Sequence, residues 1–145
     1  DTVRRALAAR LAPAPVDAPL VLVVDDSDDN RLLYASTIQE AGYRVDEATN
    51  GEEALERIRA TSPAVVVMDL SMPVLDGWQT TRRIKSDPRT SGFLGMAITA
   101  HTTMLGLRDA SDAGADAVLT KPCIPRDLLG VLESLLPEER AARLA

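Results

Sequence analysis

Cysteine and aromatic residues are scarce in this chain. Of its 145 residues, one is a cysteine, Cys123, and only 3% are aromatic, whereas 46% are hydrophobic. A single cysteine excludes an internal disulfide and is typical of a reducing compartment. The hydrophobic content is high enough for a core, and with so few aromatic rings we expect that core to be aliphatic. Cys123 is expected to be a small, buried or half-buried part of it and not a nucleophile.

Positive charge and long apolar runs are also in short supply. The chain has 16 Lys and Arg against 22 Asp and Glu, a formal net charge of −6. An acidic chain repels phosphate backbones, so direct nucleic-acid binding is disfavoured. No apolar run reaches the roughly 18 residues that a membrane helix requires. We therefore expect a cytoplasmic protein that contacts neither nucleic acid nor membrane.

Short apolar segments alternate along the chain with amphipathic ones. Five segments have the pattern of strands: 20–24, 43–48, 64–68, 93–99 and 117–120. Five have the 3.6-residue periodicity of helices: 31–41, 52–60, 78–85, 103–113 and 125–136. Alternating strands and helices with short connections predict an α/β fold, a doubly wound parallel sheet with helices on both faces. In the first helix the apolar spacing places Leu33 and Ile38 on one stripe.

The two ends of the chain differ from its middle. Residues 1–19 begin with an amphipathic helical pattern that Pro13, Pro15 and Pro19 then stop. We interpret 1–19 as a helix and linker, 20–137 as the main domain and 138–145 as a short tail. The chain does not begin with Met, which favours a piece of a longer protein, but a stand-alone domain stays open as the alternative.

Polar residues follow the predicted strands at the points where they end. The first strand ends in Asp25 and Asp26, the third in Asp69, the fourth in Thr99 and the fifth in Lys121. The carboxyl ends of parallel strands lie along one edge of a sheet, where ligands of open α/β sheets bind. These side chains can therefore converge, although Asp25 and Asp26 could instead only supply charge to a helix N-terminus. Asp28 or Asp29 is the better candidate for that capping role.

Three converging carboxylates repel one another and resist ionisation. A hard divalent cation removes that conflict, and Mg²⁺ prefers oxygen ligands from one or two carboxylates. Lys121 adds a compact positive charge and Thr99 adds a hydroxyl. Phosphoryl transfer requires this combination, since it depends mostly on positioning and charge neutralisation. Asp69, on the central strand, is the candidate nucleophile that would form an acyl phosphate.

Four pieces of sequence, in order, resemble the response-regulator receiver domain of two-component signal transduction, a CheY-like domain. They are Val-Val-Asp-Asp at 23–26, Met-Asp-Leu-Ser-Met-Pro-Val-Leu-Asp-Gly at 68–77, Ile-Thr-Ala-His at 98–101 and Leu-Thr-Lys-Pro at 119–122. The resemblance covers residues 20–137. It implies a flavodoxin-like (βα)5 fold with strand order 2-1-3-4-5.

The same resemblance assigns the site. Asp69 would accept a phosphoryl group from a phosphohistidine on a histidine kinase or phosphotransfer protein. Asp26, Asp69 and the backbone carbonyl of Ser71 would ligate Mg²⁺ directly, and Asp25 would act through bound water. Thr99 and Lys121 would contact the phosphoryl oxygens.

Three further positions would modulate the site. His101 would flank the pocket, the Lys121–Pro122 bond would be cis, and Val118 stands where many receivers carry an aromatic switch residue. Val118 therefore predicts an altered relay from Thr99. The resemblance implies a switch rather than an enzyme acting on other substrates, with the fourth helix, fifth strand and fifth helix as its protein-binding face.

Other functions remain open on the sequence. A nucleotide- or flavin-binding module would need a Gly- or Ser/Thr-rich phosphate loop after the first strand, where this chain has Asp-Asp-Ser-Asp-Asp. A small-molecule aspartyl-phosphate hydrolase would need a cap domain, for which the chain is short. A pseudo-receiver that only docks would not need every site position filled, as they are here.

Overall fold

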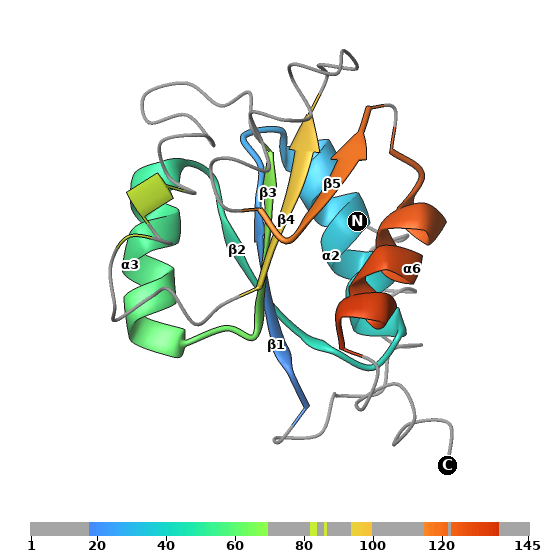
Figure 1. The fold of residues 1–145 in the computed structure, drawn as a ribbon, viewed down its shortest axis with the longest axis horizontal. Helices are drawn as coiled ribbons and strands as arrows, with labels where there is room; N and C mark the ends of the chain where they lie inside the picture. Colours follow the sequence, from blue (N-terminus) through green and yellow to red (C-terminus); the bar gives the residue numbers. More distant parts are fainter. Residues whose placement is uncertain are drawn as a thin grey trace, which may run out of the picture.

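The computed structural model describes residues 18–69, 82–83, 86, 94–99, 115–121 and 123–136 (Figure 1). Its strands are β1 (Leu20–Val24), β2 (Arg44–Ala48), β3 (Val65–Asp69), β4 (Leu94–Thr99) and β5 (Ala117–Thr120). Its helices with described bounds are α2 (Asp28–Glu40), α3 (Gly51–Thr61) and α6 (Pro125–Leu135). The predicted helices at 78–85 and 103–113 lie mostly or wholly outside the described residues, although 82, 83 and 86 are helical.

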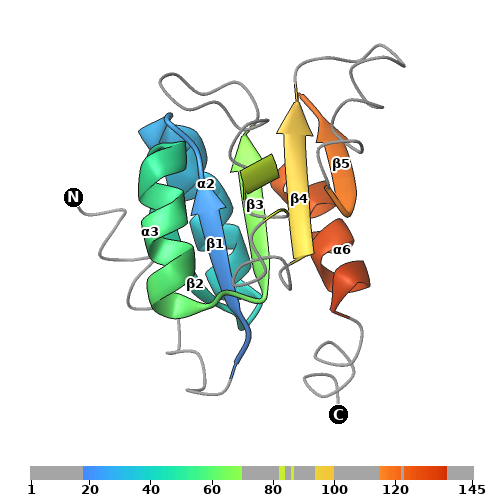
Figure 2. The ribbon, with the colours of Figure 1, turned by 60° about the vertical axis from the view of Figure 1, so that its left-hand side comes forward.

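The five strands form one parallel sheet in the order β2-β1-β3-β4-β5, which confirms the predicted topology (Figure 2). β3 occupies the centre, and all five of its residues are buried. A strand buried on both faces has no polar side of its own, which explains the unbroken run Val65–Met68. The sheet therefore places Asp69, the last residue of β3, at the end of its most buried strand.

Successive strand residues alternate between two cores, one on each face of the sheet. In Figure 1, α2 and α6 lie on one face and α3 lies on the other. Six buried strand residues face α2 and α6: Val21, Val23, Val65, Val67, Met96 and Ile98. Six face α3: Leu22, Val24, Ala48, Val66, Met68 and Ala97. The predicted inward side of α3 is correct, since Ala54, Leu55 and Ile58 are all buried there.

Two expectations about the core are wrong. The core is not purely aliphatic, because Tyr43 is fully buried and Tyr34 is 5% exposed on the α2 side of the sheet. Tyrosine is easily discounted as a core residue because of its hydroxyl, yet its ring has a large apolar area. The stripe of α2 is also rotated from the predicted one: Tyr34, Ala35 and Ile38 are buried, whereas Leu33 is 50% exposed.

The N-terminus of α2 also differs from the prediction. The helix begins at Asp28, three residues before the predicted start, because Ser27 is the N-cap and its hydroxyl accepts a hydrogen bond from the Asn30 N–H at 3.3 Å. Asp28 and Asp29 lie in the first turn, where negative charge favours the helix dipole, but neither is the cap. Gly42, at φ 101°, follows the C-terminus in the left-handed conformation that favours glycine.

Within the described ranges, none of the helices combines the length and the apolar composition that a membrane crossing needs.

The two faces of α2 can be compared by a matched pair of substitutions. Ile38→Ala removes a side chain that is 0% exposed and should lower the free energy of unfolding by about 2–4 kcal/mol. Leu33→Ala removes a half-exposed side chain and should cost less than about 1 kcal/mol. Chemical denaturation of both variants measures the difference. Equal losses would contradict the observed orientation of the helix.

Candidate acidic site at the carboxyl edge of the sheet

The register of the strands brings the predicted site residues to one edge. Val24 of β1 pairs with Met68 of β3, so Asp25 lies level with Asp69. On the other side, Asp69 pairs with Ile98, and Thr99 is the next residue of β4. Thr99 in turn pairs with Thr120 of β5, and Lys121 follows it. Segments separated by up to about a hundred residues in the sequence therefore end side by side.

Three carboxylates converge at this edge. One oxygen from each of Asp25, Asp26 and Asp69 can be chosen so that all lie within 4.8 Å of one another. Asp25 is 2% exposed and Asp69 is 3% exposed, whereas Asp26 is exposed to solvent. The cluster thus has two buried carboxylates and one at the surface, and all of its ligand atoms are hard oxygens of the kind that Mg²⁺ prefers.

Lys121 supplies a positive charge to the cluster. Its Nζ donates a hydrogen bond to Asp69 Oδ2 at 3.1 Å, from a side chain that is 31% exposed. One ammonium balances only part of the charge of three carboxylates. This imbalance is the physical reason why the described site would favour an additional cation.

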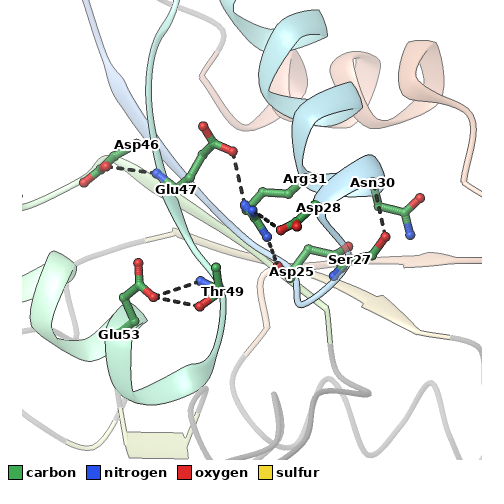
Figure 3. A network of polar contacts seen from close by, with 9 residues as sticks. All are labelled: Asp25, Ser27, Asp28, Asn30, Arg31, Asp46, Glu47, Thr49 and Glu53. Carbon is green, nitrogen blue, oxygen red and sulfur yellow. Dashed lines mark hydrogen bonds and ion pairs between the residues drawn. The ribbon is translucent and has the colours of Figure 1, made fainter.

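The segment after β1 is fixed by several hydrogen bonds. Asp25 Oδ1 accepts one from the Ser27 N–H at 2.9 Å, and the Asp25 N–H donates one to the Ala48 carbonyl of β2 at 3.2 Å. Figure 3 shows that the Arg31 guanidinium reaches Asp25, Asp28 and Glu47. It donates to the backbone carbonyl of Asp25 at 2.9 Å and to Glu47 Oε1 at 3.2 Å.

Arg31 was not among the site residues predicted from the sequence. The i, i+3 spacing of Asp28 and Arg31 on a helix was a signal for a local ion pair. The contact with Glu47, sixteen residues away on β2, has no signal in the sequence because it depends on how the helix packs against the edge strand.

Burial raises the pKa of the Asp25 carboxyl above its ordinary value. The hydrogen bond from Ser27 lowers this pKa, the negative charge of Asp69 raises it, Lys121 lowers it again and Asp26 adds a smaller increase. Burial and the repulsion from the neighbouring carboxylates outweigh the two effects that lower the pKa of Asp25. Ionised Asp25 therefore costs folding energy, which is expected where side chains are arranged for a ligand rather than for stability.

Of the remaining predicted site residues, the structure describes two and leaves three outside the described ranges. Thr99 is the last residue of β4, at the same edge. Val118 is half-buried in β5 and packs against the core on the α3 side. Ser71, His101 and Pro122 lie outside the described residues, as do the leader up to residue 17 and the tail from residue 137.

Cys123 is half-buried and packs against the core on the α2 and α6 side, as expected for a filler. Burial raises the pKa of its thiol, and Asp127 raises it further. A raised pKa keeps a thiol protonated and weakly nucleophilic.

Comparisons with known proteins agree on one family. Residues 21–133 match the family model described as the response regulator receiver domain. The chain is 33% identical over 124 residues to protein PilG of Pseudomonas aeruginosa, which covers 83% of this chain and 90% of that protein. It is 34% identical over 118 residues to a gliding motility regulatory protein of Myxococcus xanthus, covering 81% of this chain but only 15% of that protein.

The fold is also similar to solved structures. The chemotaxis response regulator CheY4 of Vibrio cholerae superposes with a TM-score of 0.77 at 30% sequence identity, covering 81% of this chain and 98% of that one. The similarity thus extends over nearly the whole of that chain.

Asp25→Asn should stabilise the protein in the absence of divalent cations, by roughly 0.5–1.5 kcal/mol, within the usual range for single substitutions. The folded state raises the pKa of Asp25, so this carboxyl favours folding only when protonated, and the contribution is lost as the pH rises through the raised pKa. The difference between variant and wild type should be full at neutral pH and shrink toward pH 3.8, the ordinary value.

Thermal unfolding in a chelator, measured across this pH range, tests the expectation. Asp116→Asn is the matched control, since Asp116 lies before β5, at the opposite edge of the sheet, and accepts a hydrogen bond from the Gly95 N–H. Destabilisation by Asp25→Asn in neutral chelating buffer would contradict the electrostatic interpretation.

Proposed function

Since this chain belongs to the response-regulator receiver domain family, we propose that it is the phosphoacceptor domain of a two-component or phosphorelay system, with Asp69 as the residue that is phosphorylated. The observation that carries the proposal is the position of Asp69. It is a buried carboxylate at the end of the central strand, beside two further carboxylates and one ammonium.

The donor set fits a magnesium ion. Three carboxylates with oxygens within 4.8 Å of one another, only partly balanced by Lys121, form a hard and electron-rich site. Asp26 and Asp69 would hold the ion directly with the Ser71 carbonyl, and Asp25 would hold it through water. When bound, the ion would neutralise charge on the phosphoryl oxygens and on the carboxylates.

The residues of the chain itself perform the transfer. A carboxylate oxygen of Asp69 attacks the phosphorus of a phosphohistidine on the partner, the phosphorus–nitrogen bond breaks, and its electron pair returns to the imidazole. An acyl phosphate forms on Asp69. Lys121, already 3.1 Å from Asp69, pairs with the new phosphoryl oxygens, and the hydroxyl of Thr99 binds another of them.

Phosphorylation would then alter a protein-binding face. In this chain the face comprises the segment 103–113, β5 and α6, and the partners are a histidine kinase or phosphotransfer protein upstream and a protein target downstream. With Val118 in place of an aromatic residue, the change at Thr99 would be transmitted through the backbone that follows it. His101 would control the access of water, and Pro122 would fix the peptide after Lys121.

The chain would then be a switch whose only chemistry is its own phosphorylation and dephosphorylation. The domain would occupy residues 20–137, preceded by the linker 1–19 and followed by the tail 138–145. The family match at 21–133 supports these limits.

Asp69→Asn should abolish phosphorylation. Wild-type protein incubated with acetyl phosphate and Mg²⁺ should gain the mass of one phosphoryl group, measured on the intact chain. Asp46→Asn is the matched control, because Asp46 is a partly buried carboxylate on β2 that pairs with Arg57 at 3.7 Å and does not belong to the acidic cluster. A mass gain that persists in Asp69→Asn would refute Asp69 as the acceptor.

Lys121→Ala should leave the fold intact and permit phosphorylation, yet uncouple it from the response of the protein. Beryllofluoride, a mimic of the phosphoryl group, should change amide hydrogen exchange in β5 and α6 of the wild type. This change should be largely lost in Lys121→Ala, because the variant has no ammonium at this position to pair with the new negative charge. Arg126→Ala removes an exposed cation of α6 and serves as control. Equal responses in the wild type and Lys121→Ala would refute the coupling role.

A further inference from the structure

Arg31 is a mostly buried cation that joins three segments of the chain. Its side chain is 13% exposed. The guanidinium donates to the backbone carbonyl of Asp25 after β1, to Glu47 on the edge strand β2, and to Asp28 on its own helix (Figure 3). An ion pair that only improved solubility would have no need of the backbone carbonyl.

The contact with that carbonyl fixes a peptide plane that two site residues share. The carbonyl of Asp25 and the Cα atoms of Asp25 and Asp26 lie in one planar unit. The preceding plane is also fixed, because the Asp25 N–H donates to the Ala48 carbonyl of β2 at 3.2 Å. Both planes around Asp25 are thus anchored to β2, one directly and one through Arg31 and Glu47.

From this geometry we propose that Arg31 is a positioning residue for the cation site: it holds the Asp25–Asp26 peptide against β2 and thereby sets the affinity of the acidic cluster for Mg²⁺. The inference rests on the proposed function in that the cluster binds this ion. Two carboxylates of the cluster follow β1 while the third ends β3. Their separation therefore depends on how firmly the segment after β1 is fixed.

Charge and position predict opposite effects for Arg31. A cation beside three carboxylates opposes the arrival of a second cation, so if Arg31 acted by charge alone, Arg31→Ala would tighten Mg²⁺ binding and Arg31→Lys would leave it unchanged. If Arg31 acts by position, both variants weaken binding. Lysine keeps the charge, but its compact ammonium cannot reproduce the planar fork that reaches three acceptors.

The test is Mg²⁺ titration of the full chain by calorimetry at constant ionic strength, with folding of each variant checked by circular dichroism. Arg31→Lys should raise the Kd for Mg²⁺ about tenfold, at the lower end of what outer-shell substitutions cost metal sites. Amide hydrogen exchange at Asp25 and Asp26, measured by NMR without Mg²⁺, should be faster in the variant. Glu47→Ala should raise the Kd by a smaller factor, because Arg31 still donates to Asp25.

The chain offers a matched control in Arg57. Its Nε lies 3.7 Å from Asp46 Oδ2, and Asp46 and Glu47 project to opposite faces of β2 because they are neighbours on a strand. Arg57→Lys makes the same chemical change in the other ion pair of this strand and should leave the Kd unchanged.

The outcomes separate this inference from the proposed function. If the wild type binds Mg²⁺ and is phosphorylated while Arg31→Lys matches Arg57→Lys in both Kd and amide exchange, the positioning role is overturned and the proposed function stands. Tighter binding by Arg31→Ala would also overturn it, in favour of charge alone. If Glu47→Ala has the same Kd for Mg²⁺ as the wild type, the contact between Arg31 and Glu47 of β2 does not contribute to the positioning. If the wild type binds no Mg²⁺, the cation site and the role of Arg31 fail together.

Discussion

Mutual repulsion among the carboxylates at the carboxyl edge of the sheet is the constraint on which the site depends. Asp25 and Asp69 are almost completely buried, and an oxygen of each lies within 4.8 Å of the other and of Asp26. Burial alone already disfavours the charged form of Asp25 and raises its pKa. The arrangement persists because stable elements impose it: the register of β1 and β3 places Asp25 level with Asp69, and backbone hydrogen bonds hold both flanks of Asp25. The acidic cluster thus destabilises the fold at one edge of the sheet, and the two hydrophobic cores on the faces of the sheet offset that cost.

The surrounding residues compensate for this repulsion in different ways. Lys121 offsets charge directly, through one hydrogen bond to Asp69. Ser27 stabilises the ionised form of Asp25 with its backbone N–H and also caps α2 with its hydroxyl. Arg31 instead holds the backbone, since its contact is with the Asp25 carbonyl and not with the carboxylate. A bound cation would complete the balance.

The resemblance to a known family predicted the strand order, which the sheet confirms. The strand ends, which apolar runs mark clearly, predicted that Asp25, Asp26, Asp69 and Lys121 lie together. The predictions from the sequence were wrong where helix packing determines which of two neighbouring side chains is buried. Leu33 and Tyr34 are neighbours on α2, and only the angle at which the helix meets the sheet determines that the tyrosine is buried. The contact of Arg31 with Glu47 was not predicted for a related reason, because Glu47 becomes its partner only after α2 packs beside β2.

The strands that carry the two opposite charges of the site differ greatly in burial. β3 is buried along its whole length, whereas β5 has four residues, three half-buried and one exposed, at the rim of the sheet. Thinly covered edge strands open locally at lower free energy than central ones. The ammonium of Lys121 is therefore attached to a compliant support and the carboxylate of Asp69 to a rigid one. A molecule built in this way can let its cation follow a newly arrived anion while the carboxylate stays fixed.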